Sequence, residues 1–261
     1  MRIATWNINS VRIRIAQVLR FIKEYKIDVM CLQETKTEDQ FFPSNEFTEA
    51  GMIYQNFRGE KSYNGVAIIS KIPIKNKSFE QFCGLNDTRH VSIMLENNIT
   101  IHNFYVPAGG DVPDIKTNEK FNHKINFIKE MINYFHKINL KNTILVGDFN
   151  IAPYENDVWS HKQLLNVVSH TPIEIEQLSK LIDDSNWVDV GRKFIPKHEK
   201  LYSWWSYRNR DWKKSNRGRR LDHIWVSKDL DTELKSFLSC KEIRDWEKPS
   251  DHVPLIIELS I

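Results

Sequence analysis

The stretch Thr143–Asn150, Thr-Ile-Leu-Val-Gly-Asp-Phe-Asn, joins a β-rich apolar run to a polar cluster and is the best single guide to the fold. Side chains alternate along an extended chain, so Phe149 would point inward while Asp148 and Asn150 point outward. A carboxylate and an amide placed together at a strand end can position a water molecule and bind a phosphoryl oxygen. An ordinary turn that ends a strand is the alternative interpretation.

Three more polar clusters stand next to apolar runs in the same way. Trp6–Asn9 and Gln33–Lys36 each follow such a run, and Ser250–His252 precedes the last one. Each cluster taken alone also fits a solvated loop or turn. Carboxylates gathered from distant parts of a chain repel one another unless a cation joins them. We therefore expect these strand ends to meet at one rim of a sheet, around a hard divalent metal and a phosphate substrate.

Strands and helices are predicted in both halves of the chain. Apolar, β-forming runs predict strands at Arg2–Trp6, Ile27–Leu32, Gly65–Ser70, Val91–Glu96, Ile99–Val106, Thr143–Val146, Leu221–Ser227 and Val253–Leu259. Helical spacing predicts helices after Ser10, which can act as a cap, around Phe121–Phe135 and around Ile175–Ile182. Without a Pro/Gly/Ser-rich linker between the halves, we expect one domain over 1–261. Its strands would form two packed sheets with helices outside.

The composition narrows the class of protein. The 261 residues are 41% apolar, enough for a sizeable core, while 37 basic and 34 acidic side chains give +3, too little to imply a polyanionic partner. No early stretch resembles a signal peptide, and no apolar run approaches the roughly 18 residues that span a bilayer. The cysteines are odd in number, without CxxC spacing, and Cys31 lies in an apolar run. We therefore expect a reduced, cytoplasmic setting.

The segment Tyr202–Arg220 interleaves aromatic and basic side chains, and Asp211 is its one acidic residue. Stacking of bases or sugars on its tryptophans, beside a phosphate-binding stripe, is the functional interpretation. In the alternative, Trp205 and Tyr207 belong to the core and the basic side chains are merely solvated. We expect each interpretation to hold for part of the segment.

Two further side chains complete the candidate chemistry. A histidine such as His252 can accept a proton or, when charged, bind a phosphate. Asp222, at the start of a predicted strand, could orient His252 as a carboxylate fixes an imidazole tautomer in hydrolytic triads. The phenol of Tyr105, at the end of a predicted strand, could donate a hydrogen bond to a developing oxyanion. His223 fits packing on the other face of its strand.

Taken in this order, the motifs resemble the endonuclease/exonuclease/phosphatase superfamily, and within it the exonuclease III branch of apurinic/apyrimidinic (AP) endonucleases. The motifs are Leu32–Lys36, Tyr63–Ala67, Gly147–Asn150, Arg220–Asp222 and Ser250–His252. The resemblance implies an α/β (α+β) fold, a four-layer sandwich of two packed mixed β-sheets flanked by helices. It also implies Mg²⁺-dependent hydrolysis of DNA 5′ to abasic sites, with Mn²⁺ as a substitute, and 3′-to-5′ exonuclease and 3′-phosphatase activities. We expect a monomer that acts on double-stranded DNA with abasic sites or blocked 3′ ends, away from membranes.

The resemblance also implies roles for individual residues. Glu34 matches the principal metal ligand, and further metal-site groups are expected at Asn7, Asp148, Asn150, Asp251 and His252. Catalytic groups are expected at Tyr105, Asp148, Asn150, Asp222 and His252. Among them, the last two form an Asp–His pair beside the scissile phosphate. DNA contacts are expected from Lys36, Arg89, Trp204, Arg208, Asn216, Arg219 and Leu221.

One position departs from the family pattern. The residue before Arg220 is apolar or aromatic in relatives, whereas here it is Arg219, which would line an apolar sugar pocket poorly. This leaves open the balance among AP incision, exonuclease and phosphatase activity. The number of metals is also open, as is the choice between Asp148 and the His252–Asp222 pair as the base. Two rival functions are a phosphodiesterase or phosphatase of the same fold with a non-DNA substrate, and a nucleic-acid-binding protein without catalysis.

Overall fold

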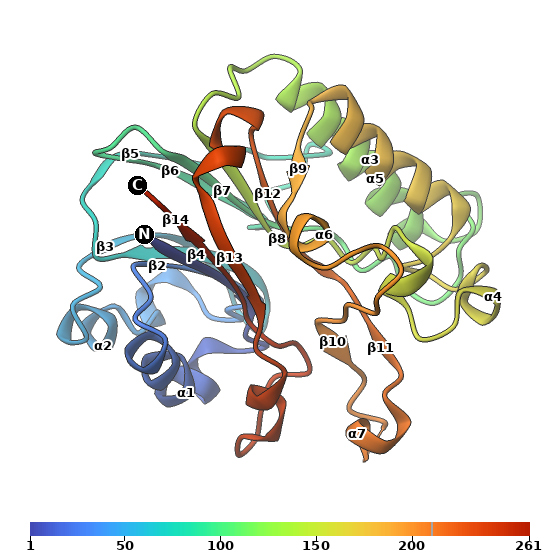
Figure 1. Cartoon of the computed structure of the whole chain (residues 1–261), viewed down its shortest axis with the longest axis horizontal. Coiled ribbons are helices and arrows are strands. Elements are labelled where there is room, and N and C mark those ends of the chain that lie inside the picture. Colours follow the sequence, from blue (N-terminus) through green and yellow to red (C-terminus); the bar gives the residue numbers. More distant parts are fainter. Residues whose placement is uncertain (210) are drawn as a thin grey trace.

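Two six-stranded β-sheets face each other, and helices cover both outer faces (Figure 1). The coordinates are a computed structural model that describes residues 1–209 and 211–261, so Arg210 of the basic aromatic segment lies outside the described residues. Each sheet contains one parallel pair of neighbouring strands, and its other pairs are antiparallel. The predicted four-layer sandwich of two mixed sheets is confirmed.

The first sheet has the strand order β13 (Leu234–Ser239), β14 (Leu255–Leu259), β1 (Arg2–Asn7), β2 (Val29–Gln33), β4 (Tyr63–Ser70) and β3 (Tyr54–Glu60). Alternation along β2 places Cys31 in the core between the sheets and Met30 and Leu32 on the outer face. There they pack with α1 (Val11–Glu24) and α2 (Ser44–Glu49). Both faces of the strand are therefore buried, which explains its continuous apolar run.

The second sheet has the order β5 (Ile74–Ser78), β6 (His90–Leu95), β7 (Thr100–Tyr105), β8 (Thr143–Asp148), β12 (Asp222–Val226) and β9 (Val188–Asp189). Helices α3 (Glu119–Phe135) and α5 (Pro172–Asp184) lie side by side over its outer face (Figure 1). Helix α5 begins with a capping box between Thr171 and Glu174. The parallel pairs β1–β2 and β7–β8 end at the same rim of the sandwich, because Asn7 at the end of β1 contacts Asp148 at the end of β8.

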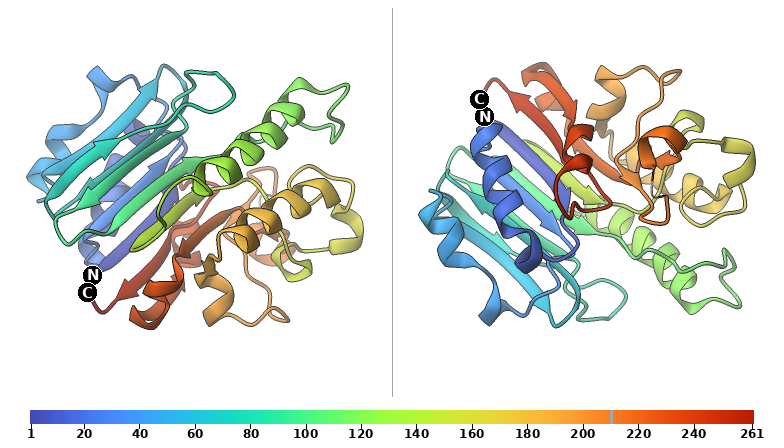
Figure 2. Two further views of the ribbon diagram at one scale, coloured as in Figure 1. Left: turned by 90° about the horizontal axis from the view of Figure 1, so that it is seen from above. Right: turned by 90° about the horizontal axis from the view of Figure 1, so that it is seen from below.

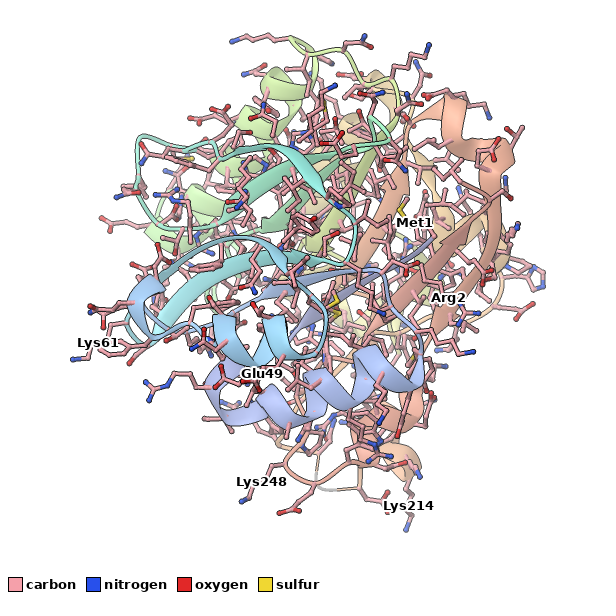
Figure 3. The ribbon with its side chains drawn as sticks, turned by 90° about the vertical axis from the view of Figure 1, so that its left-hand side faces the viewer. Met1, Arg2, Glu49, Lys61, Lys214 and Lys248 are labelled. Atoms are coloured by element: carbon pink, nitrogen blue, oxygen red, sulfur yellow. The ribbon has the colours of Figure 1, made fainter. Side chains whose placement is uncertain are left out.

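The remaining elements are short. They are α4 (His161–Leu164), α6 (Val190–Phe194), α7 (Trp212–Ser215), the ribbon strands β10 (Trp204–Trp205) and β11 (Gly218–Arg219), and the 3₁₀ turns η1 (Asp39–Phe41), η2 (Glu155–Asp157), η3 (Lys228–Glu233) and η4 (Lys241–Asp245). The β10–β11 ribbon carries α7 at its tip, and Lys213 there pairs with Asp245 at 2.6 Å. Lys214 and Lys248 project from this end of the molecule (Figure 3). The two chain ends lie side by side elsewhere (Figure 2), where the Met1 amino group donates to Leu259 O at 2.8 Å.

All eight predicted strands and all three predicted helices are present, with shifted ends. Sequence reasoning missed β3, β5 and β13, because each is a half-exposed edge strand whose polar residues break the apolar run. The proposed cap was wrong: Ser10 precedes α1 but its side chain makes no capping hydrogen bond. Cys31 and His223 are buried as expected. Of the two aromatic residues that the alternative interpretation assigns to the core, Trp205 is buried but Tyr207 is exposed. Within the described residues, no helix is both long and apolar enough to cross a membrane.

Three buried histidines should make this fold sensitive to acid. Burial lowers the pKa of His102 and of His223 to about 3, and the pKa of His90 is also lowered. They are neutral in the folded protein but protonate near pH 6.5 when it unfolds. Stability from these groups is complete above about pH 6.5 and is lost as the pH falls toward 3, by about 1.4 kcal/mol per pH unit for each histidine.

Urea titrations at pH 6, 5 and 4 test this with His102→Gln, which keeps a hydrogen-bonding side chain beside His90. The variant should show a smaller loss of unfolding free energy with acid than the wild type, by about 1.4 kcal/mol per pH unit. Equal slopes for the two proteins would show that His102 is not buried in its neutral form.

Candidate active site

Five strand ends or strand starts deliver the candidate catalytic side chains to one place. Tyr105 at the end of β7 is the register partner of Asp148 in β8, and Asp148 is also paired with Asp222 in β12. Asn7 ends β1, and Glu34 directly follows β2. The two sheets therefore meet at this rim, and the predicted convergence of distant segments is confirmed geometrically by hydrogen bonds across it.

Glu34 is held by groups from two other segments and by Lys36 of its own loop. Asn7 Nδ2 donates to Glu34 Oε1 and to Asp148 Oδ2, both at 2.9 Å, and the Tyr105 hydroxyl also donates to Oε1 at 2.9 Å. The Lys36 ammonium lies 2.6 Å from Oε2. Burial opposes ionisation, but Lys36 and the hydrogen bond from Asn7 outweigh it and lower the pKa of Glu34. The side chain is therefore a fixed carboxylate.

A sharp backbone turn presents the Glu34 side chain. Glu34 has a φ of 50°, in the left-handed region, so the chain leaves the direction of β2 there. Its carbonyl accepts the backbone N–H of Ser10 at 2.7 Å, and Thr35 O accepts that of Val11 at 3.1 Å. The loop after β2 is thus fixed to the start of α1, which explains why the two predicted polar clusters lie together.

Asp148 is buried, and the residue before it packs very closely against β7. A Cβ atom on the preceding residue, Gly147, would lie 1.9 Å from Phe104 O, so only glycine fits there. Asp148 Oδ1 accepts the Asn150 N–H at 2.9 Å, and Oδ2 accepts Asn150 Nδ2 at 3.2 Å. Burial, only partly offset by His252, raises the pKa of Asp148 to about 7. Asp148 and Asn150 therefore act as one hydrogen-bonded unit.

His252 lies between two carboxylates. Its Nδ1 is 2.8 Å from Asp222 Oδ2, and its Nε2 is 3.8 Å from Asp148 Oδ2. Burial lowers the pKa of the imidazole, but the Asp222 and Asp148 charges outweigh it and raise the pKa of His252 to about 10. The ring is thus held as an imidazolium whose Nδ1–H donates to Asp222.

Ser203, which sequence reasoning missed, fixes Asp222. Its hydroxyl donates to Asp222 Oδ2 at 2.6 Å and accepts the backbone N–H groups of Leu221 and Asp222, each at 3.0 Å. A serine inside an aromatic segment carries no signal of this role in the sequence. We infer that Ser203 positions the Asp222–His252 pair.

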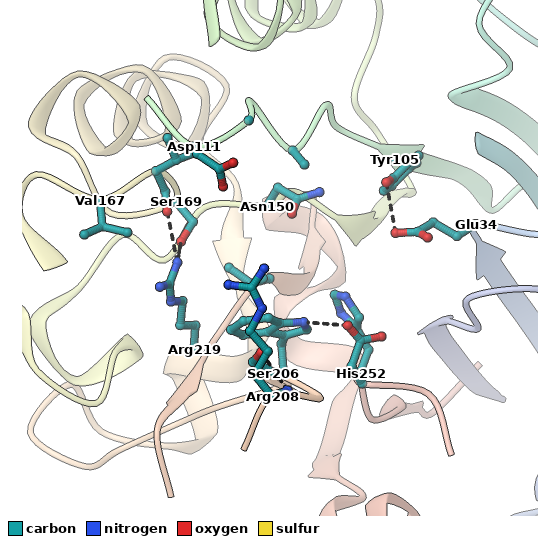
Figure 4. A pocket seen from close by; sticks show the side chains of 16 residues that line it. Glu34, Tyr105, Asp111, Asn150, Val167, Ser169, Ser206, Arg208, Arg219 and His252 are labelled. Atoms are coloured by element: carbon teal, nitrogen blue, oxygen red, sulfur yellow. Dashed lines mark hydrogen bonds between the residues drawn. The ribbon is translucent and has the colours of Figure 1, made fainter. Parts of the chain in front are cut away.

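A cavity of about 510 Å³ opens over this rim (Figure 4). The predicted residues that line it are Glu34, Tyr105, Asn150, Trp204, Arg208, Arg219, Leu221, Asp251 and His252. Residues not singled out from the sequence also line it, among them Asp111 and Ser169. Trp204 donates its indole N–H to Asp251 Oδ2 at 3.0 Å, which fixes the ring in the wall.

Three predicted DNA-contact residues lie outside this lining. The Lys36 ammonium forms an ion pair with the Glu34 carboxylate, as described above. Arg89 pairs with Asp87 and lies under the Tyr105 ring, 4.9 Å from its centroid, in a neighbouring cavity. Asn216 accepts the Trp205 indole N–H at 3.1 Å near the tip of the β10–β11 ribbon. The structure thus gives Asn216 a role in shaping the ribbon.

Two groups of side chains could hold a metal ion. Among the described residues, Asp148, Asp222 and His252 bring ligand atoms within 4.8 Å of one another. In that trio the imidazolium already supplies a positive charge between the carboxylates. At the other position, Glu34 Oε2 and Asn9 Oδ1 both contact the Lys36 ammonium, at 2.6 and 2.7 Å. Carboxylate and amide oxygen atoms that together contact a cation in this way are suitable ligands for Mg²⁺ or Mn²⁺.

Comparison with known proteins gives matches over the whole chain. The sequence model of the Endonuclease/Exonuclease/phosphatase family matches residues 4–252. Exodeoxyribonuclease III of Haemophilus influenzae is 32% identical over 272 residues, covering 99% of this chain and 99% of that protein. An AP endonuclease from Archaeoglobus fulgidus superimposes with a TM-score of 0.93 at 30% identity, covering 100% of both chains. The 3′ phosphatase NExo from Neisseria, solved with a product DNA hairpin, gives a TM-score of 0.91 at 27% identity over 99% of both chains.

Proposed function

Because the chain belongs to the endonuclease/exonuclease/phosphatase family, we propose that it is a divalent-metal-dependent DNA repair nuclease. It would cleave the phosphodiester 5′ to an abasic site and also act on blocked 3′ ends. The exodeoxyribonuclease III, AP endonuclease and 3′-phosphatase relatives support this class of activity. The observation that carries the proposal is the shared cavity, whose lining combines Glu34 and His252 with Trp204 and basic side chains.

The metal would be held at Glu34. The carboxylate is ionised, faces the cavity and already contacts an ammonium group at 2.6 Å. Asn7 orients it and keeps Asp148 beside it through the shared amide. When bound, a divalent ion polarises a phosphoryl oxygen and stabilises the charge on the leaving oxygen. We assign Mg²⁺, or Mn²⁺ in its place, because the available donors are hard oxygen atoms.

His252 would bind the scissile phosphate. Asp222 occupies Nδ1, so Nε2 is the ring nitrogen that faces Asp148 and the cavity. An imidazolium in this position can donate to a phosphoryl oxygen but cannot accept a proton. We assign to Asp148, whose Oδ2 lies 3.8 Å from His252 Nε2, the role of taking the proton of the attacking water. The open choice of base is therefore proposed to fall on Asp148.

Tyr105 would stabilise the charge that develops on the phosphate, and Asn150 would hold Asp148 in place. Burial and the neighbouring Glu34 and Asp148 carboxylates raise the pKa of Tyr105 well above its ordinary value, so its phenol stays a hydrogen-bond donor. Asn150 is fixed by bonds from its side-chain N–H groups to Val106 O and Asp148. The Tyr105 hydroxyl, which now donates to Glu34 Oε1, is a donor positioned beside the metal-binding carboxylate before the reaction.

An end-labelled duplex with one stable abasic analogue tests this function. With Mg²⁺ or Mn²⁺ we expect a single cut on the 5′ side of the analogue, and with EDTA no cut. Shortening from the 3′ end in the same reaction would reveal the exonuclease activity, and loss of a terminal 3′-phosphate would reveal the phosphatase. Hydrolysis of nucleotides or phospholipid head groups without any cleavage of DNA would contradict the proposal.

A further inference from the structure

Arg219 occupies the wall of the cavity away from the catalytic groups. It pairs with Trp204 across the β10–β11 ribbon, and Trp204 forms a bridge with His252 on its other side. Neighbouring strands lie about 4.8 Å apart, so the Arg219 backbone is roughly 10 Å from that of His252. In Figure 4 its side chain lies across the cavity from Glu34 and Tyr105.

The guanidinium of Arg219 is held in a fixed position. Its Nη1 donates to Val168 O at 3.0 Å and to Ser169 Oγ at 2.7 Å, and its Cζ lies 5.4 Å from the centre of the Trp204 ring. The backbone N–H of Ser169 in turn donates to the buried carboxylate of Glu174 at 3.0 and 2.9 Å. The charged group is therefore placed before any ligand arrives.

No carboxylate in the described part of the chain forms an ion pair with this charge, and the buried Glu174 acts on it only from beyond ion-pair distance. Within residues 1–209 and 211–261, no carboxylate lies within ion-pair distance of Arg219, and its buried Nε has no hydrogen-bond partner. The adjacent Arg220 is different, because Asp189 and Asp157 accept its N–H groups at 2.8 to 2.9 Å. Burial lowers the pKa of Arg219, yet an arginine stays charged in proteins. A half-buried cation that lines a cavity, and that has no ion-pair partner among the described residues, is suited to bind an anion.

The identity of that anion follows from the proposed function, on which this inference rests. If the bond 5′ to an abasic sugar is cut, the scissile phosphate lies near His252 and the sugar extends toward Trp204. The next anionic group along the strand is the phosphate on the 3′ side of that sugar. We propose that Arg219 binds this second phosphate and so determines specificity, favouring cleavage within a strand over removal of a terminal nucleotide, which has no 3′ phosphate.

A matched pair of substrates tests the contact. Both are duplexes with an internal tetrahydrofuran abasic analogue, followed on the 3′ side by a phosphodiester in one and by an uncharged methylphosphonate in the other. Single-turnover incision by the wild type should be about 10- to 100-fold slower on the uncharged substrate, the range of a charged hydrogen bond. Arg219→Gln should distinguish the two substrates by less than about 3-fold, since its charge is already gone. Equal penalties in the two proteins would overturn the proposal.

Three controls test whether the effect is specific to the charge of Arg219 and to the first phosphate on the 3′ side. Arg219→Lys retains the charge and should retain most of the discrimination. Lys213→Gln removes a charge on the ribbon that is already paired with Asp245, so it should leave the wild-type discrimination intact. With the wild type alone, a methylphosphonate one linkage further along should cost little. If the wild type were slowed by the methylphosphonate at the second linkage and not by the one at the first, Arg219 would not bind the proposed phosphate. This outcome needs no folded variant.

The two proposals can fail separately. If the wild type with Mg²⁺ incises neither substrate, the proposed function is wrong. If it incises both at the same rate, the nuclease function stands and the role of Arg219 is refuted.

Discussion

Replacing Glu34 with glutamine should slow metal-dependent incision by about 10³-fold, which corresponds to about 4 kcal/mol of transition-state stabilisation. Glutamine keeps the shape of the side chain and one oxygen that can accept from Asn7 and Tyr105. It removes the charge, and its amide N–H₂ would face the Lys36 ammonium that now contacts Oε2. The loss should therefore fall on metal binding and not on packing.

Single-turnover incision rates at several Mg²⁺ concentrations measure this effect, and circular dichroism checks the fold. The matched control is Glu49→Gln, an exposed carboxylate at the end of α2 (Figure 3) that does not line the cavity. That variant should keep its rate within about 2-fold. A Glu34→Gln protein with the wild-type rate and the wild-type metal requirement would remove Glu34 from the mechanism.

Asp222→Asn should slow incision by about 10³- to 10⁴-fold, comparable to the loss when the carboxylate of a hydrolytic triad becomes an amide. The amide can no longer stabilise the imidazolium charge of His252, and it can present an N–H₂ group to Nδ1, which donates its proton in the native pair. Ser203→Ala leaves the carboxylate but removes the hydroxyl that fixes it at 2.6 Å. We expect a smaller loss for it, about 10-fold, as for other groups that orient a catalytic side chain.

Rates on the abasic-analogue duplex, with thermal unfolding as a check, distinguish these variants. If Asp222→Asn and Ser203→Ala lost equal activity, the pair would be a structural contact and not a catalytic one. Wild-type rates in Asp222→Asn would show that His252 needs no carboxylate partner.

The site residues at the strand ends could be predicted from the sequence, because at each of these ends an apolar run stands next to a carboxylate, an amide or an imidazole. Asp148 and Glu34 are examples. Hydrophobicity predicts the buried strand that precedes each of them, and a charged residue directly after such an apolar run is unusual. Their meeting is a consequence of topology, because each lies at the end of the later strand in a parallel pair. The resemblance to a family then supplied the roles that spacing alone left open.

Other parts of the site depend on tertiary contacts that leave no local signal. Lys124 lies on a helix with a clear apolar period, and a lysine there would ordinarily be expected to face solvent. In the structure it is fully buried and pairs with Glu174. Its ammonium also donates to Ala108 O at 3.2 Å and Asn150 O at 2.8 Å, and so ties the Asn150 loop to the two outer helices. Arg219 was recognisable as a departure from the family pattern, but only the structure shows that it has no ion-pair partner in the described part of the chain.

Anomalous diffraction from crystals grown with Mn²⁺ would locate the bound cation and so bears on the whole mechanism. We predict a peak in the cavity within about 2.1 Å of a Glu34 carboxylate oxygen, and no such peak in crystals of Glu34→Gln. A peak among Asp148, Asp222 and His252 without Glu34, or an empty cavity at saturating Mn²⁺, would contradict the account.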